Sequence, residues 1–89
     1  MSLEKNWVLQ ISPSVYKFLN GIPRYDAERI FSKIENLRKN PFEGDVKKKQ
    51  GVEDIWRQRI GSYRIFYEIL PKAMVILVFH VERRTSSTY

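Results

Sequence analysis

The sequence predicts an α+β domain, in which two helices in the first half of the chain cover a small β-sheet. Residues 13–39 carry apolar side chains at helical spacing. Residues 51–81 are rich in β-branched and aromatic side chains around short turn signals. Two helices that share one apolar side can bury it against such a sheet. At 89 residues the chain is long enough for one modest core, so we expect a single domain over residues 1–89.

Composition narrows the classes of function. The sequence has no cysteine and one histidine, so it offers no disulfide framework, no thiolate chemistry and no metal-ligand spacing, and we expect no metal or cofactor. No apolar run approaches the roughly 20 residues that span a bilayer, and no signal-peptide pattern opens the chain. We therefore expect a cytoplasmic protein without a membrane partner. The net charge of +6 favours a polyanionic partner.

The first elements in chain order are a strand and a short helix. Residues 6–11 are expected to form a strand, and one of its faces collects the larger apolar side chains: Trp7, Leu9 and Ile11. Ser12 suits the N-cap, and Pro13 the first position, of a helix that ends near Leu19. Gly21 is expected to adopt the left-handed conformation that commonly follows a helix.

A second helix is expected from about Arg24 to Lys39. Apolar side chains recur along it at helical spacing and are expected to lie in the core: Tyr25, Ala27, Ile30, Phe31, Ile34 and Leu37. Arg38 and Lys39 fall in its last turn, where cations suit the helix dipole, and Pro41 follows its end. The two helices form a helical hairpin whose apolar side can cover a sheet.

The most informative stretch runs from Gly51 to Tyr67 and is expected to form a β-hairpin. Its two strand-like runs flank Gly61–Ser62, the composition of a two-residue turn that begins with glycine. Cross-strand partners share a face. If Ile60 pairs with Tyr63, one face collects core side chains: Trp56, Ile60, Tyr63, Ile65, Tyr67 and Ile69. The other face collects Arg57, Arg59, Arg64, Phe66 and Glu68.

We call the second of these faces the arginine face, after Arg57, Arg59 and Arg64. Arg59 lies directly opposite Arg64 in this register, and like charges so placed destabilise a strand pair unless an anion compensates them. Guanidinium groups match phosphate oxygens two at a time, so this face is a candidate phosphate-binding surface. The alternative is that the arginines are solvated, or pair with Glu68 and the C-terminal carboxylate.

A second basic cluster precedes the hairpin. It consists of Lys47, Lys48 and Lys49. Lysines in such a position either contact a nucleic-acid backbone or form a solvated strand edge that resists aggregation. Both interpretations stay open.

The last strand is expected over residues 74–81, because this nearly unbroken apolar run is typical of a central strand buried on both faces. A two-residue loop at Pro71–Lys72 would bring Arg83 beside Arg64 on the arginine face. With the same loop, alternation along the strand would point His80 into the core as a structural histidine.

Taken together, these features resemble the RelE/ParE superfamily of bacterial and archaeal toxins over nearly the whole chain. The most specific part is Gly-x-x-Asp-Ile-Trp-Arg-x-Arg-Ile-Gly-x-Tyr-Arg-Ile-x-Tyr at Gly51 to Tyr67, joined by a tail that carries Arg83, Arg84 and Tyr89. The resemblance implies two N-terminal helices packed on a small twisted, mainly antiparallel sheet. It also implies the toxin of a type II toxin–antitoxin system, neutralised by a separately encoded antitoxin in a hetero-oligomer.

Within this superfamily, the RelE branch cuts mRNA in the ribosomal A site and the ParE branch poisons DNA gyrase. The basic and phenolic residues favour the RelE branch, and the resemblance implies the following catalytic set: Arg57, Arg59, Arg64, Arg83 and Tyr89. The expected RNA-binding set is Lys47, Lys48, Lys49, Arg57, Arg59 and Arg84. The implied chemistry is metal-independent attack of a 2′-hydroxyl on the adjacent phosphodiester. Tyr89 would stack on a base, transfer a proton or simply pack on the sheet.

The sequence departs from the family pattern at the paired hairpin positions, where well-studied relatives carry lysines. Here both positions, 57 and 59, are arginine. Arginine stays protonated in proteins, so neither residue can be an ordinary general base. The proton would then pass to Tyr89, the ribosome or water. Two other functions remain open: a gyrase inhibitor, and a non-catalytic basic module that binds nucleic acid or an antitoxin.

Overall fold

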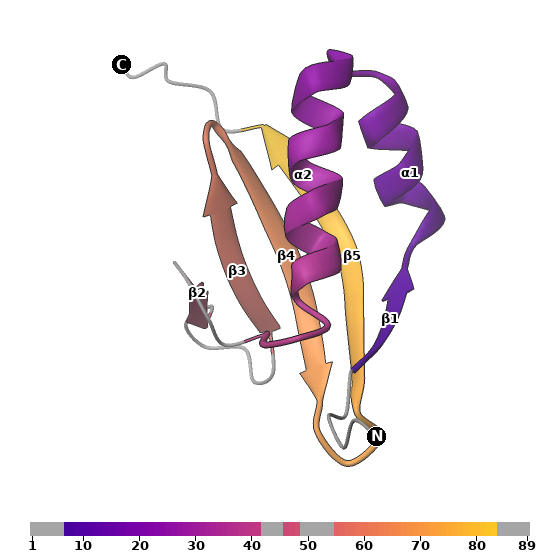
Figure 1. Ribbon diagram of the computed structural model, residues 1–89, viewed down its shortest axis with the longest axis vertical. Coiled ribbons are helices and arrows are strands. Elements are labelled where there is room, and N and C mark those ends of the chain that lie inside the picture. The colour runs from indigo at the N-terminus through magenta and orange to yellow at the C-terminus, as the bar shows by residue number, and fades with distance from the viewer. Residues whose placement is uncertain (1–6, 42–45, 49–54, 84–89) are drawn as a thin grey trace, which may run out of the picture.

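The computed structural model of the chain describes residues 7–41, 46–48 and 55–83, which form two helices on one face of a five-stranded sheet (Figure 1). The elements in chain order are β1 (Val8–Ile11), α1 (Pro13–Asn20), α2 (Arg24–Asn36), β2 (Val46–Lys48), β3 (Ile55–Ile60), β4 (Tyr63–Leu70) and β5 (Val75–Arg83). The predicted α+β class and the helical hairpin over a sheet are confirmed.

The sheet is mixed but mainly antiparallel. Its strand order is β1-β5-β4-β3-β2, in which β1 pairs with β5 in parallel and every other neighbouring pair is antiparallel. The parallel pairing requires a crossover, and α1 and α2 are part of the connection that supplies it. The sheet architecture agrees with the arrangement that the resemblance implied.

The core lies between the helices and the sheet. Buried side chains from both layers form it: Val15, Leu19, Ile30, Ile34, Leu37, Tyr63, Ile65, Tyr67, Ile69, Ile76, Val78 and Val81. The predicted inner faces of the first strand and of the hairpin are confirmed, because Trp7, Leu9, Ile11, Trp56 and Ile60 pack against this cluster. Gln58 shares the inner face of β3 and is only 2% exposed, a buried polar residue that hydrophobic patterning missed.

The hairpin has the predicted register. Arg59 pairs with Arg64, Arg57 with Phe66 and Trp56 with Tyr67. Gly61 has φ +59°, and Ser62 does not have a positive φ, so the turn carries its left-handed residue at the first position only, as in a type II′ turn. The guanidinium of Arg29 lies close by, because a Cβ at Gly61 would be 3.5 Å from its Nη2.

Two predictions about the ends of the helices are wrong: the left-handed conformation of Gly21 and the last residue of α2. Gly21 follows α1 with φ −100°, outside the left-handed region, because its N–H closes a tight turn on the carbonyl of Phe18 at 3.0 Å. The helix α2 ends at Asn36, not at Lys39, because the residues after Asn36 form hydrogen bonds to carbonyls three residues earlier, as in a 3₁₀ turn. The N–H of Lys39, for example, donates to the carbonyl of Asn36 at 3.1 Å. Ser12 holds the N-cap position of α1, but its side chain forms no capping hydrogen bond.

Two aromatic residues of α2 do not lie in the core, contrary to the prediction. Tyr25 is 71% exposed and Phe31 is 37% exposed. The helix faces the core through Ile30, Ile34 and Leu37, so aromatic side chains on its flanks remain at the surface.

The predicted pairing of the last strand is wrong, because the connection before it is longer than predicted and the strand contains a β-bulge. The connection between β4 and β5 is four residues long, 71–74, so Leu70 pairs with Val75. Further along, the register shifts between Phe66 and Tyr67, which leaves Phe79 as an extra residue in β5. A bulge of one residue reverses which side chains face the core beyond it.

The bulge moves two site residues to the faces opposite those predicted. Arg83 pairs with Tyr63 on the helix-covered face and does not lie beside Arg64 on the arginine face. His80 pairs with Phe66 on the arginine face and is exposed, where a core position was expected. Glu82, which pairs with Arg64, joins the same face.

Candidate functional site on the arginine face

The arginine face is built from two neighbouring rows of cross-strand partners on β3, β4 and β5. One row consists of Arg59, Arg64 and Glu82, and the other of Arg57, Phe66 and His80. Both helices lie on the opposite face of the sheet (Figure 1). The sequence correctly predicted that Arg57, Arg59 and Arg64 share one face, and the structure adds an imidazole and a carboxylate beside them.

A carboxylate links two of these side chains. Glu82 Oε2 lies 3.7 Å from Arg64 Nη1, and Glu82 Oε1 lies 3.2 Å from His80 Nε2. Arg64 therefore pairs with Glu82, where the sequence offered Glu68 as its alternative partner. The 3.7 Å contact is long and both side chains are partly exposed, so the ion pair contributes about 0–1 kcal/mol and leaves the guanidinium able to contact a phosphate as well.

The other two arginines of the face differ from Arg64, which pairs with Glu82. Within residues 7–41, 46–48 and 55–83, neither Arg57 nor Arg59 forms an ion pair. Phe66 lies between Arg57 and His80 and is 8% exposed. Its ring centroid is 5.4 Å from that of His80 at a tilt of 49°, so the aromatic ring supports the imidazole.

The residue before Arg64 fastens the hairpin to the helical layer. The Tyr63 hydroxyl donates a 2.9 Å hydrogen bond to Asp26 Oδ2 on α2, and the Phe18 ring meets the Tyr63 ring edge-on at 6.1 Å. Burial and the bond to Asp26 raise the pKa of Tyr63 above its ordinary value. Arg83 lies over the same ring, with its Cζ 5.8 Å from the centroid.

A buried tyrosine holds the other end of the hairpin. The Tyr67 hydroxyl donates to the Pro41 carbonyl at 2.9 Å and accepts from Gln58 Nε2 at 3.4 Å. Burial raises the pKa of Tyr67 to about 12. These bonds connect β3, β4 and the segment that follows α2, so they hold the strands that carry the arginines in place from the helix-covered face of the sheet.

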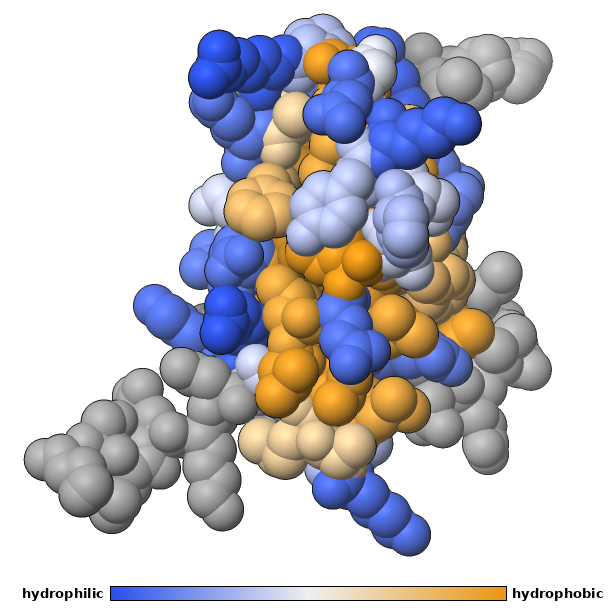
Figure 2. Space-filling view, turned by 90° about the vertical axis from the view of Figure 1, so that its right-hand side faces the viewer, coloured by the Kyte–Doolittle hydropathy of each residue, from blue (hydrophilic) through white to orange (hydrophobic). Residues whose placement is uncertain are grey.

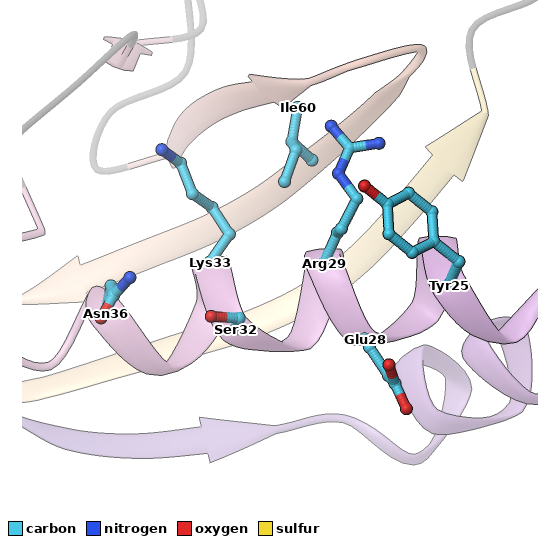
Figure 3. Close-up of a pocket in the computed structure, with 7 residues that line it drawn as sticks. All are labelled: Tyr25, Glu28, Arg29, Ser32, Lys33, Asn36 and Ile60. Carbon is cyan, nitrogen blue, oxygen red and sulfur yellow. The ribbon is translucent and has the colours of Figure 1, made fainter.

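A groove of about 350 Å³ lies between α2 and the end of β3 (Figure 3). Arg29 and Lys33 project from one side of the helix toward Ile60, whereas Glu28 points to the other side (Figure 3). Tyr25 shares the groove, with the Arg29 Cζ 5.6 Å from its ring centroid. Positions 25, 29 and 33 are four residues apart, so their side chains lie on one side of the helix. This group was not predicted from the sequence, because Tyr25 was assigned to the core.

Apolar side chains gather on the side of the molecule that carries α1 and β1 (Figure 2). The exposed apolar residues Val8 and Leu70 flank Val75, since both pair with it across the sheet. Apolar side chains of three neighbouring strands, β1, β5 and β4, therefore lie together at this end of the sheet.

Several predicted site residues are not placed by the structure. The backbone of Lys47 and Lys48 belongs to β2, where position 47 pairs with Arg57. Lys49, Arg84 and Tyr89 lie outside the described residues. In the part of the chain that is described, no three His, Cys, Asp or Glu side chains are grouped to hold a metal ion. No described helix has the length and apolar character to cross a membrane.

Comparison with known proteins defines the class. Residues 9–87 match the family model described as the ParE toxin of the type II toxin–antitoxin system, parDE. The chain therefore belongs to this family and is a type II toxin of the RelE/ParE superfamily.

Individual relatives agree with this assignment. Putative toxin RelE1 of Methanocaldococcus jannaschii is 29% identical over 79 residues, covering 85% of this chain and 88% of that protein. A chain of the archaeal RelE–RelB complex from Pyrococcus horikoshii OT3 matches with a TM-score of 0.79 and 26% identity, over 92% of this chain and 99% of that one. A chain of the RelBE2 toxin–antitoxin complex from Mycobacterium tuberculosis shares the fold, with a TM-score of 0.77 at 16% identity over 89% and 99% of the two chains.

Proposed function

We propose that this toxin is a ribosome-dependent endoribonuclease, which cleaves mRNA by attack of a ribose 2′-hydroxyl on the adjacent phosphodiester. The observation that carries the proposal is the pair Arg59 and Arg64, directly opposite each other on a face that the helices leave uncovered, with Arg57 in the next row. Guanidinium groups on directly opposed residues favour an anion with several oxygens, and a phosphodiester supplies them.

The arginines would act mainly by stabilising the negative charge that develops on the phosphate during the reaction. Attack on phosphorus builds negative charge on the non-bridging oxygens, and preorganised cations stabilise it without rearranging at the moment of reaction. In this proposal Arg64 stabilises that charge, while Arg57 and Arg59 position the strand. The internal nucleophile and these cations together make the reaction metal-independent.

The remaining predicted residues would extend the contact beyond the arginine face. Arg83 lies on the helix-covered face next to the Tyr63 ring, so we assign it to RNA that passes around the end of the hairpin. Lys47, Lys48, Lys49 and Arg84 would contact phosphates further along the strand, and Tyr89 would stack on a base or transfer a proton.

We also propose an antitoxin as the protein partner, in a toxin–antitoxin hetero-oligomer. The chain belongs to a family of toxins from type II systems, and the similar P. horikoshii structure is a RelE–RelB complex. The arginine face, together with the apolar surface on the side that carries α1 and β1 (Figure 2), suits an acidic, amphipathic segment. Such a segment would neutralise the toxin by covering its arginines.

The proposal is tested by primer extension on an mRNA translated by purified ribosomes. We expect cuts within A-site codons with the wild-type protein and none with Arg64→Ala. Arg38→Ala is the matched control, because it removes one exposed arginine that lies after the end of α2 and pairs with Glu35 at 3.5 Å. An uncut message with folded wild-type protein would contradict the proposal.

Gyrase inhibition is the second candidate, since the matching family model is that of ParE toxins. A supercoiling assay with purified gyrase distinguishes the two functions. Inhibited supercoiling with an intact message would favour the gyrase inhibitor. If gyrase and mRNA were both unaffected, salt-sensitive binding to nucleic acid would point to a non-catalytic module.

A further inference from the structure

The proposed reaction needs a proton acceptor that the arginines cannot provide. The attacking 2′-hydroxyl must lose its proton, and guanidinium groups stay protonated in proteins. A positioned side chain that accepts this proton typically accelerates such a reaction by about 10²–10⁴-fold. The described part of the arginine face contains one imidazole, that of His80, which the β-bulge places there.

The imidazole belongs to a chain of three side chains that ends on Arg64. Glu82 bridges the other two, with one carboxylate oxygen 3.2 Å from His80 Nε2 and the other 3.7 Å from Arg64 Nη1. If Nε2 donates its proton to Glu82, then Nδ1 carries the lone pair and is free to accept a proton. About half of the His80 side chain is exposed, so a substrate can reach it.

We propose that His80 is the general base of this toxin and that Glu82 is the residue that positions it. The inference rests on the proposed endoribonuclease function and supplies the proton acceptor that the paired arginines lack. A carboxylate that fixes one imidazole nitrogen and leaves the other to take a proton is the arrangement of many hydrolytic sites. Here the same carboxylate also orients the arginine that would bind the phosphate.

The step balances without any further reactant. The 2′-oxygen forms a bond to phosphorus while its proton passes to His80 Nδ1, and the bond from phosphorus to the 5′-oxygen breaks. The departing 5′-oxygen takes a proton from water. The products are a 2′,3′-cyclic phosphate and a 5′-hydroxyl, and His80 later returns its proton to solvent.

The charged groups around His80 come from three strands. Glu82 lies on β5 with it, and Arg64 and Glu68 lie on the same face of β4. Arg57 lies on β3, in the same row as His80. Of these groups, Glu82 is the one in hydrogen-bond contact with the ring, so it fixes the orientation of the imidazole.

The test measures the single-turnover rate of cleavage of a ribosome-bound message across pH 5.5–8.5. We expect His80→Gln to lower the rate at pH 7.5 by about 10²–10⁴-fold, with unchanged ribosome binding and thermal unfolding. We expect added imidazole to restore part of the rate of His80→Ala. We also expect Glu82→Gln to lower the rate at pH 7.5, because the imidazole loses the carboxylate that orients it.

Glu68→Gln is the matched control for Glu82→Gln, because it removes a carboxylate from the same face outside the His80–Glu82–Arg64 chain. Its pH–rate profile should match that of wild type. The inference would be overturned by a His80→Gln variant that cleaves within about threefold of wild type while Arg64→Ala is inactive, and in that case the proposed function would stand. A wild-type protein that cuts no message would overturn both.

Discussion

The hydroxyl of Tyr63, the first residue of β4, donates a 2.9 Å hydrogen bond to Oδ2 of Asp26 in the first turn of α2. This bond fastens the end of the hairpin to the helices on one side of the sheet. The next residue, Arg64, points to the opposite face, as alternation along a strand requires. The Gly-x-Tyr-Arg sequence therefore combines a turn, an anchor and a site residue in four positions.

Removing the anchor should destabilise the fold. Tyr63→Phe deletes the bond to a carboxylate, and we expect the free energy of unfolding to fall by about 1.5 kcal/mol. The measurement is urea unfolding followed by circular dichroism. Tyr16→Phe, a change at an exposed tyrosine of α1, is the control and should have little effect. Equal stability of the two variants would show that the bond to Asp26 contributes nothing.

The buried Tyr67 should make the fold sensitive to alkali. The folded protein holds the pKa of Tyr67 at about 12, above the ordinary value of 10. Below pH 10 the hydroxyl is protonated in both states, and its contribution is complete. As the pH rises from 10 to 12 the unfolded chain loses this proton first, so the free energy of unfolding should fall by about 3 kcal/mol.

Tyr67→Phe separates the contribution of Tyr67 from that of the other groups that lose a proton at alkaline pH. The variant should be less stable at neutral pH, because Pro41 and Gln58 lose a buried partner. Its further loss of stability between pH 10 and 12 should be smaller than that of wild type. Parallel curves for the two proteins over that range would contradict the raised pKa.

Two glycines provide a matched test of the hairpin turn. Gly61 has φ +59°, so Gly61→Ala should cost about 1–2 kcal/mol through backbone strain. Gly21 has φ −100°, and a Cβ there would meet its nearest atom at an ordinary 3.6 Å. Gly21→Ala should therefore be neutral or stabilise by up to about 1 kcal/mol. Thermal unfolding of both variants decides the matter, and equal losses would contradict the assigned turn.

The start of α1 yields a further stability prediction. Replacing a capping serine by alanine usually costs about 1 kcal/mol. The Ser12 side chain makes no capping bond, and its carbonyl, which accepts the Val15 N–H at 2.9 Å, is retained in alanine. We expect Ser12→Ala to change the free energy of unfolding by less than about 0.5 kcal/mol. A loss of a full kcal/mol would indicate that the side chain caps the helix in solution.

The hairpin could be predicted from sequence because its information is local. Glycine at position 61 fixes a two-residue turn, and that turn fixes every pair up to Trp56 and Tyr67. The core stripe of α2 was equally visible, but periodicity could not show that Tyr25 on its flank is exposed. Alternation also could not identify Gln58 as buried, because its partner, the Tyr67 hydroxyl, lies on another strand.

The last strand could be predicted only in part, because a bulge leaves no clear mark on an apolar run. The side chains at positions 75–78 lie on the faces that alternation along the strand predicted. Beyond the extra residue Phe79, the two faces are exchanged. That single residue turned Arg83 to the helix-covered face and brought His80 and Glu82 to the arginine face. The candidate proton acceptor was therefore hidden from sequence reasoning, although the arginines beside it were not.

The most direct test of the account replaces the nucleophile in the substrate. An mRNA that carries a single 2′-deoxynucleotide on the 5′ side of the scissile phosphate is placed in the A site of purified ribosomes and incubated with the toxin. We predict that cleavage at that phosphate disappears, while an all-ribose message in the same ribosomes is cut and leaves a 2′,3′-cyclic phosphate. Undiminished cleavage of the deoxy-substituted message would contradict attack by the 2′-hydroxyl, and with it the mechanism assigned to the arginine face.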